Sequence, residues 1–204
     1  MKVISWNVNG LARCKRKGFL KFLADAKPDV LCCQEIKGQC ALNVPGYLQF
    51  WNPAKRVNYS GTLILAKRQP LSCQYGLGIE KFDDEGRLIT LEYKDYFIVD
   101  IYVPNLNTHS NPDRLDFRIE WDKAVREYVT KLPKPVIMCG DFNVARKYID
   151  IYPENQKNTP SSSFENMGFN RLRQSLINIE SPLKRTLSAF PPLRISPSNK
   201  LRRS

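Results

Sequence analysis

The stretch that decides the fold is PVIMCGDFNVA, residues 135–145, in which an apolar run stops abruptly at a carboxylate. Positions 136–139 are apolar or small, and Gly140 follows them. A short apolar run bounded by glycine is typical of a buried β-strand. Taken alone, Asp141 and Asn143 are also consistent with a simple turn, because both residue types tolerate turn geometry.

Three other segments repeat this pattern of an apolar strand that ends in polar side chains. They are KVISWNVNG with Asn7 and Asn9, DVLCCQEIK with Glu35, and YFIVDIYVPN with Tyr102 and Asn105. In layered α/β proteins such strand ends converge on one rim, and ligands bind there. One such ending indicates a turn, whereas four of them together indicate a site.

The remaining pattern predicts an α/β protein with a mixed sheet arrangement. The expected strands cover residues 2–6, 29–36, 46–52, 58–68, 87–93, 96–103 and 135–139, with a hairpin between 87 and 103. Two helices are expected, over 115–132 and over 16–26, where Phe19, Leu20 and Leu23 share one face. Many strands, two intervening helices and adjacent hairpins predict a layered α/β fold.

Length and composition limit the class of protein. The chain has 204 residues, enough for one sizeable core, and 42% of them are hydrophobic. No apolar run reaches the length of about 18 residues that a membrane span needs. Met1 leads directly into a strand pattern, so no signal peptide is expected.

The cysteines indicate a reducing compartment. None of the six belongs to a C-x-x-C pair, and the single histidine, His109, is remote from them in sequence, which argues against zinc. Cys32, Cys33 and Cys139 fall in strand-like runs, as is typical of free buried thiols. We therefore expect a cytoplasmic protein.

The charge favours a polyanionic partner and is unevenly distributed. The formal net charge is +12, which favours nucleic acid first and an anionic membrane surface second. Residues 159–204 carry eight Lys or Arg against two Asp or Glu, a net +6, and are rich in Ser and Pro. We expect a domain over 1–158 and a disordered basic tail over 159–204, which is either a solvated tail or a nucleic-acid-binding arm.

The polar strand endings suit phosphoryl chemistry with a hard cation. Such ions take oxygen ligands and keep several waters, and Asn7 and Glu35 offer such oxygens. Asp141 and Asn143 could orient a water and the phosphate that it attacks. Tyr102 adds a phenol, and Asn105 adds an amide at the same rim. Each of these residues also has a structural interpretation, such as a turn, an exposed charge or a core aromatic.

Five motifs occur in an order that resembles a known family. ISWNVNG, CQEIK, YSGT, YVPN and GDFNVA follow one another as in the exonuclease III-type abasic-site (AP) endonucleases of the endonuclease/exonuclease/phosphatase superfamily. The resemblance covers roughly residues 1–158. It implies a four-layer α/β sandwich of two packed sheets flanked by helices. It also implies hydrolysis of DNA phosphodiesters at abasic sites and 3′ ends.

The resemblance assigns expected roles to these residues. It implies a Mg²⁺ ion, with Mn²⁺ as the alternative, bound by Glu35 with Asn7 beside it. The residue matching Asp141 handles the attacking water, the one matching Asn143 stabilises the transition state, and the one matching Tyr102 is also catalytic. We count Asp141 and Asn143 with Asn7 and Glu35 as the metal-binding group. The expected partner is DNA containing abasic sites, and the protein is expected to be a monomer that binds no membrane.

The match to the family stops near residue 158. The family continues with a tryptophan-rich DNA-contacting segment and a closing Ser-Asp-His motif with a catalytic histidine, whereas no Asp-His pair occurs here. His109 matches no catalytic position. We therefore expect an incomplete second sheet, activity far below the family's norm, and a tail derived from a shifted reading frame. The alternatives are an inactive truncated relative that at most binds DNA, and a phosphatase of the same superfamily.

Overall fold

Two β-sheets form the centre of the molecule in the computed structural model, which describes residues 1–105 and 114–144. Within these ranges each sheet has four strands. The first sheet has the order β1-β2-β4-β3, with strands β1 Val3–Asn7, β2 Val30–Gln34, β4 Thr62–Ala66 and β3 Leu48–Asn52. The second has the order β5-β6-β7-β8, with strands β5 Ser72–Tyr75, β6 Leu88–Glu92, β7 Phe97–Tyr102 and β8 Val136–Asp141.

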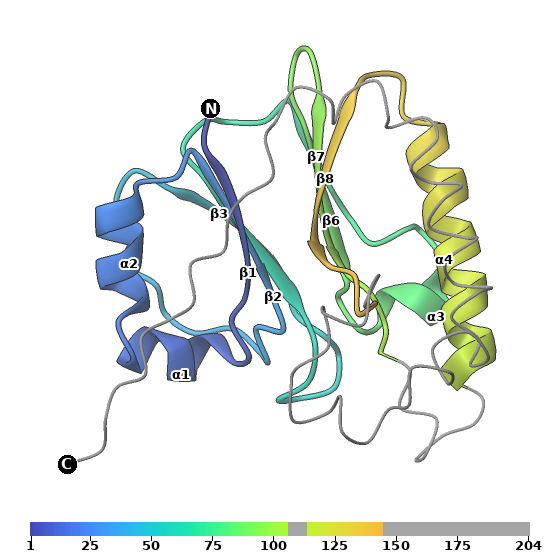
Figure 1. Cartoon of the computed structure of the whole chain (residues 1–204), viewed down its shortest axis with the longest axis horizontal. Helices are drawn as coiled ribbons and strands as arrows, with labels where there is room; N and C mark the ends of the chain where they lie inside the picture. The colour runs from blue at the N-terminus through green and yellow to red at the C-terminus, as the bar shows by residue number, and fades with distance from the viewer. Residues whose placement is uncertain (106–113, 145–204) are drawn as a thin grey trace, which may run out of the picture.

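Helices cover the outer face of each sheet (Figure 1). The first sheet carries α1 Leu11–Arg16 and α2 Phe19–Ala26, and the second carries α3 Glu80–Asp83 and α4 Arg114–Thr130. The order of layers is therefore helix, sheet, sheet, helix. This arrangement confirms the expected four-layer α/β sandwich.

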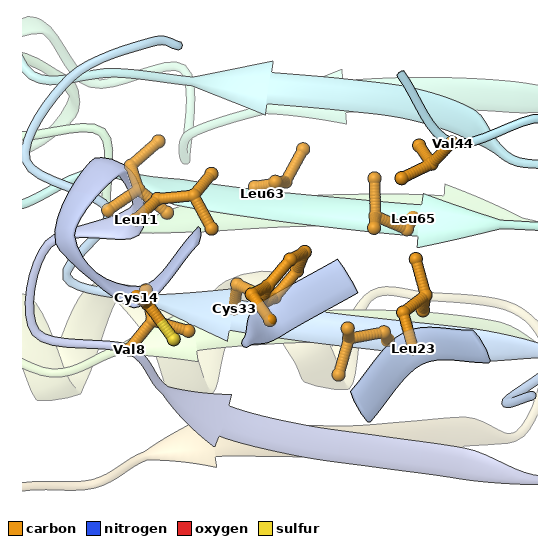
Figure 2. Packing of buried hydrophobic residues seen from close by; sticks show 11 residues of the cluster. Val8, Leu11, Cys14, Leu23, Cys33, Val44, Leu63 and Leu65 are labelled. Carbon is orange, nitrogen blue, oxygen red and sulfur yellow. The ribbon is translucent and has the colours of Figure 1, made fainter. Parts of the chain in front are cut away.

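The strands place alternate side chains in different layers, as the two-residue period of a strand requires. In β2, Leu31 and Cys33 pack toward the helices, whereas Val30 and Cys32 pack into the interface between the sheets. Because both faces of β2 are buried, its first four residues are continuously apolar rather than alternating. Figure 2 shows the helix-side cluster, in which Leu11 and Leu23 lie over the first sheet.

The first helical region differs from the expectation. A single helix over 16–26 was predicted; α2 begins later, after Gly18 with a φ of 104°, and α1 was not predicted. The predicted apolar face was also wrong at Leu20, which is 37% exposed. Phe22 packs instead against the ring of Trp6, with the ring centroids 4.8 Å apart. The glycine changes the direction of the chain, so the helical period does not continue across it.

Glycine also decides the end of β8. The strand was expected to stop at residue 139, but it continues through Gly140 to Asp141. Gly140 has a φ of 148°, and a Cβ atom there would collide with the carbonyl oxygen of Ile101. The close approach that glycine permits keeps β8 paired in parallel with β7, so that Asp141 lies opposite Tyr102. Neither β5 nor α3 was predicted, and each has only four residues.

Some expectations concern parts of the chain outside the described residues. These are the position of His109, the character of the tail over 159–204 and any strands of the second sheet that would follow residue 144. In the two described ranges, no helix combines the length and the apolar character that crossing a membrane requires.

One polar contact crosses the apolar interior between the two sheets. Gln34 Nε2 donates to Asp100 Oδ1 at 2.7 Å and to Ser5 Oγ at 3.1 Å. The exposed fractions of Gln34 and Asp100 are 1% and 0%. Burial raises the pKa of Asp100 well above its ordinary value, and the hydrogen bond from Gln34 opposes that rise. Asp100 is therefore stabilised in its neutral form.

The hydrogen-bonding pattern of the pair supports a neutral Asp100. Gln34 Oε1 and Asp100 Oδ2 are buried and find no hydrogen-bond partner within the described ranges. A carboxylate only accepts hydrogen bonds, whereas a carboxylic acid carries one O–H donor. Protonation therefore gives Asp100 an O–H donor, which is the kind of hydrogen-bond partner that the buried Gln34 oxygen lacks.

We expect Asp100→Asn to become progressively more stable than the unchanged protein as the pH rises. The folded-state pKa of Asp100 exceeds the unfolded value of about 3.9, so ionisation costs the folded protein stability above that pH. Asparagine cannot ionise. The difference in unfolding free energy, from urea denaturation between about pH 4 and about pH 8, should widen by at most about 1.4 kcal/mol per pH unit.

The neighbouring thiols do not disturb this comparison below about pH 8. A hydrogen bond with Cys139 and burial raise the pKa of Cys32 well above its ordinary value, and burial raises that of Cys33, so both thiols stay protonated with or without the Asp100 charge. A difference that stays constant over the whole pH range would show that Asp100 ionises as easily in the folded protein as in the unfolded chain.

Candidate active site

The ends of strands from both sheets meet at one rim, and one asparagine connects them. Asn7, the last residue of β1, donates through Nδ2 to Glu35 Oε2 at 3.1 Å and to Asp141 Oδ2 at 2.7 Å. A side-chain amide nitrogen carries two hydrogens, so one group serves both carboxylates. Asn7 Oδ1 in turn accepts from the backbone N–H of Asn9 at 3.0 Å. The structure thus brings together residues from three separate motifs.

Glu35 follows β2 in an unusual backbone conformation. Its φ is 57°, in the left-handed region, and Lys37 has a φ of 56°. Lys37 Nζ lies 3.0 Å from Glu35 Oε1 and donates to Asn9 Oδ1 at 2.7 Å. The carboxylate of Glu35 therefore carries an amide on one oxygen and an ammonium on the other.

The YSGT motif supports the turn that carries Glu35. The backbone N–H of Ile36 donates to the carbonyl of Gly61 at 3.2 Å, and that of Lys37 donates to the carbonyl of Ser60 at 2.8 Å. A Cβ atom on Gly61 would lie 2.8 Å from Ile36 Cγ1. The glycine in this motif thus allows two turns from different parts of the chain to pack closely.

Asp141 and Asn143 close a turn, and Asp141 also contacts the rest of the rim through Asn7. Asp141 Oδ1 accepts from the backbone N–H of Asn143 at 2.9 Å, which is the side-chain-closed turn that aspartate favours. Asn143 has a φ of 46° and donates through Nδ2 to the carbonyl of Val103 at 2.8 Å. The other carboxylate oxygen of Asp141 faces Asn7. The two interpretations of this stretch are therefore compatible.

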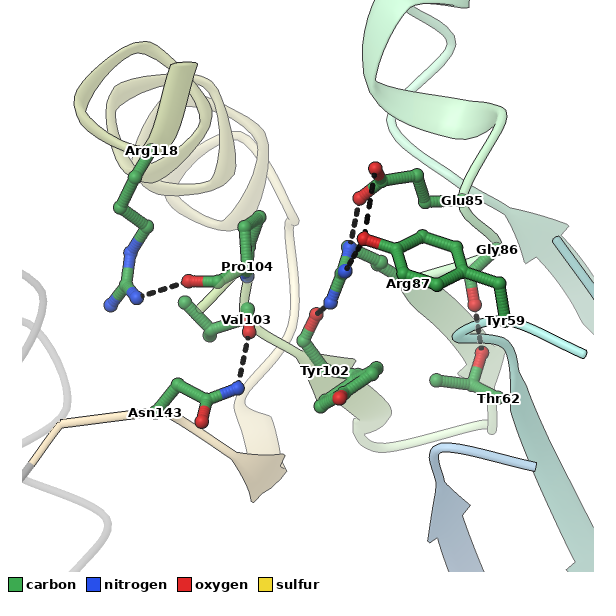
Figure 3. Close-up of polar contacts among 10 residues, drawn as sticks. All are labelled: Tyr59, Thr62, Glu85, Gly86, Arg87, Tyr102, Val103, Pro104, Arg118 and Asn143. Atoms are coloured by element: carbon green, nitrogen blue, oxygen red, sulfur yellow. Dashed lines mark hydrogen bonds and ion pairs between the residues drawn. The ribbon is translucent and has the colours of Figure 1, made fainter. Parts of the chain in front are cut away.

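Tyr102 lies at the end of β7 against a buried arginine (Figure 3). The guanidinium carbon of Arg87 is 4.5 Å from the centroid of the Tyr102 ring. Burial raises the pKa of Tyr102 to about 12; the negative charges of Glu35 and Asp141 also raise it, while Arg87 opposes them. The phenol therefore stays protonated at neutral pH, so it can donate a hydrogen bond but cannot act as a base.

Sequence reasoning missed Arg87 and its partners. Arg87 is 3% exposed and bonds to the Glu85 carboxylate, the carbonyl of Tyr102 and the hydroxyl of Tyr59. In the sequence, Arg87 is an ordinary charge before an apolar strand, which indicates a solvated residue. The sequence signal that could have indicated its burial is the adjacent Gly86, because a glycine can mark a close backbone approach. A Cβ atom at Gly86 would collide with the carbonyl of Asn52. A close backbone approach at that point leaves little room for solvent.

Asn105 is the predicted site residue with the least structural support. It is exposed and lies three positions beyond the end of β7. Asn7, Glu35, Asp141 and Asn143 lie in one hydrogen-bonded group, and Tyr102 lies opposite Asp141 in the β7–β8 ladder.

The donors at this rim fit a hard divalent cation. Glu35 and Asp141 supply carboxylate oxygens and Asn143 supplies an amide oxygen, which are the ligands that Mg²⁺ and Mn²⁺ take. Asn7 presents its amide nitrogen to both carboxylates, so its oxygen would join them as a ligand only after the amide turns over. No group of three or more His, Cys, Asp or Glu suitable for a metal occurs within residues 1–105 and 114–144. A cation held by one or two carboxylates plus water and substrate oxygens is consistent with that arrangement. It would have to displace Lys37 from Glu35 Oε1 to use that oxygen.

Residues 4–167 match the family described as the Endonuclease/Exonuclease/phosphatase family, and the chain belongs to that family. Nucleases of this family generally depend on a divalent metal ion. The rim of carboxylates and amides at the end of a four-layer sandwich is therefore the candidate catalytic centre.

The sequence is similar to those of nucleases of the exonuclease III type. The chain is 43% identical over 175 residues to an exodeoxyribonuclease of Bacillus subtilis, a match covering 83% of the chain and 66% of the relative. It is 41% identical over 175 residues to a DNA-(apurinic or apyrimidinic site) endonuclease of Dictyostelium discoideum, covering 81% of the chain and 48% of that protein. The chain thus spans less than two thirds of the length of these relatives.

A solved structure agrees with the fold. The AP endonuclease from Leishmania major has a TM-score of 0.65 and 26% sequence identity, covering 88% of this chain and 66% of that one. The resemblance of the ordered motifs to exonuclease III-type AP endonucleases is confirmed by these comparisons.

We expect Glu35→Gln to weaken divalent-cation binding by at least about tenfold, because it replaces a charged oxygen ligand with a neutral one. The measurement is titration calorimetry of the purified chain with Mn²⁺ at low ionic strength. Asp25→Asn is the matched control, since Asp25 is an exposed carboxylate paired with Lys21 on α2. Equal Mn²⁺ affinity in both variants would remove Glu35 from the metal site.

Proposed function

We propose that this chain is a DNA-repair nuclease of the exonuclease III type, which hydrolyses DNA phosphodiesters at abasic sites and at 3′ ends. The observation that carries the proposal is the hydrogen-bonded group in which Asn7 joins Glu35 of the first sheet to Asp141 of the second. The names of the relatives support DNA as the substrate. The formal net charge of +12 suits a polyanion.

The residues of the site would divide the reaction among them. Glu35, with Asn7 beside it, would hold Mg²⁺, or Mn²⁺ in its place; the ion would supply a positive charge that offsets the charge developing on the phosphate. Asp141 has one oxygen fixed by the Asn143 backbone and one by Asn7, so its carboxylate is preorganised to orient a water. Each of these interactions fixes geometry before the substrate arrives, which is the main source of such catalysis.

The neutral groups of the rim would bind the substrate. Tyr102 would donate a hydrogen bond from its phenol to a phosphate oxygen, because its pKa, raised to about 12, keeps the proton in place. One hydrogen of the Asn143 amide is directed to Val103, and the second would be available for the phosphate in the transition state. Asn105 would contact the DNA from the exposed end of the segment that follows β7. We further propose that the chain acts as a monomer in the cytoplasm.

We expect the purified chain to incise a DNA duplex that carries one abasic site, in a reaction that a metal chelator stops. Asp141→Asn should lower the rate by about 10²–10⁴-fold, as loss of a group that orients or deprotonates the nucleophile typically does. Rates are measured by gel electrophoresis of a labelled strand, with Mg²⁺ and then with Mn²⁺. Asp25→Asn, on the exposed face of α2, is the control and should cut at the unchanged rate.

The outcomes separate the proposal from its alternatives. Cutting by Asp141→Asn at the control rate would exclude the proposed site. A folded chain that binds the duplex without cutting it would be a DNA-binding relative without activity. Hydrolysis of a soluble phosphomonoester together with intact DNA would identify a phosphatase of the same family.

A further inference from the structure

Three consecutive backbone carbonyls at the end of β7 are each held by a different side chain (Figure 3). Arg87 Nη1 donates to the carbonyl of Tyr102 at 3.0 Å, and Asn143 Nδ2 donates to that of Val103 at 2.8 Å. Arg118 Nη1 donates to the carbonyl of Pro104 at 2.6 Å. The three donors come from the start of β6, the turn after β8, and α4. They satisfy the segment where sheet pairing ends and its carbonyls would otherwise lack partners.

Arg118 connects this segment to the second side of the site. Its Nη2 donates to the carbonyl of Phe142 at 3.1 Å, and its Nε lies 2.9 Å from both carboxylate oxygens of Asp122. Phe142 stands between Asp141 and Asn143. One guanidinium therefore holds both the carbonyl before Asn105 and the carbonyl between the two residues of the Asp141 turn.

The chemistry of arginine explains why this residue type stands here. A guanidinium is planar and directs five N–H donors in fixed directions. A lysine ammonium at the same place has no such fixed fork and could not hold an aspartate and two separate carbonyls in one plane. Arg118 has an exposed fraction of 0% and Asp122 one of 2%, so the pair forms inside the core.

Stability alone does not account for a buried ion pair at this place. The cost of removing two charges from water often exceeds their attraction, and apolar side chains of similar volume stabilise a core as well or better. The specific gain here is geometric. Arg118 and the bond from the Val103 N–H to the carbonyl of Asp141, at 2.8 Å, join segments 102–104 and 141–143 into one unit.

We propose that Arg118 is a positioning residue of the active site. It acts through the carbonyls of Pro104 and Phe142 and fixes the Asp141 turn relative to Tyr102 and Asn105. It contacts no substrate. This inference rests on the proposed nuclease function, because its catalytic consequence is seen only if the chain cuts DNA. Its structural consequence is measurable without any reaction.

The test compares the unchanged protein with a double variant, Arg118→Met with Asp122→Leu. Both charges are removed together, so no unpaired charge remains in the core. On a duplex carrying a tetrahydrofuran abasic-site analogue, with Mg²⁺, kcat should fall on the order of 10²-fold, as expected when a reacting group is misplaced by about 1 Å. KM and the dissociation constant for Mn²⁺ should each change by much less than kcat, since Asn7 and Glu35 belong to the other sheet and stay in place. A purely structural role would lower the fraction of active protein without this separation.

Hydrogen exchange supplies the readout that is independent of catalysis. The backbone N–H groups of Val103 and Asn143 should exchange at least about tenfold faster in the double variant, whereas that of Leu31 in β2 should be unchanged. If the double variant fails to fold, Arg118→Lys replaces it; its charge stays beside Asp122, and the same two amides should exchange faster. Glu120→Gln is the control, since Glu120 lies on the exposed face of α4 and pairs with Lys81 of α3.

The two proposals fail in different ways. If the unchanged protein cuts no DNA and the double variant still exchanges faster, the nuclease function is overturned and the structural part of this inference stands. Unchanged exchange at Val103 and Asn143 would overturn the inference, whatever the rate of cutting. Faster exchange with an unchanged kcat would overturn the catalytic role of Arg118.

Discussion

The packing of the two sheets against each other is the constraint on which the rest of the structure depends. The candidate site takes Asn7 and Glu35 from the first sheet and Tyr102 and Asp141 from the second, so its geometry exists only while the sheets stay aligned. Apolar contacts hold layers together without fixing their alignment, because they have no direction. Directional contacts between the sheets include the bonds from Asn7 to Asp141 at the rim, from Gln34 to Asp100 beneath it, and from Asn52 to the carbonyl of Leu88.

The parts of the fold that sequence could predict are those in which one physical preference acts alone. The strands β2, β4 and β7 were visible because nearly every position is buried, and the hairpin of β6 and β7 was visible because its two runs lie next to each other. The start of α2 was not visible in the sequence and α1 was not predicted, because the positive φ of Gly18, which marks the change in direction, belongs to the backbone. Short elements such as α3 carry too few residues to show a period.

The candidate site was predictable where polar residues follow an apolar strand, because nothing in the strand explains them. Arg87 and Arg118 were not, since charged residues on a helix or before a strand are normally solvated. Their burial follows from tertiary contacts with backbone carbonyls of Tyr102 and Pro104, which no local pattern encodes. The Asp141 turn shows that a structural and a functional interpretation need not compete, because the same hydrogen bonds that close the turn also orient the carboxylate.

The backbone conformation of the rim sets the stability of the protein against the side chains that the rim carries. Asn9, Glu35, Lys37 and Asn143 all have positive φ values, between 44° and 57°, and each such conformation costs a residue other than glycine about 1 kcal/mol or more. The rim is thus the part of the molecule where replacement by glycine would relieve strain while removing a functional group. Thermal stability and the polar side chains of the rim therefore place opposite demands on the backbone at these four positions.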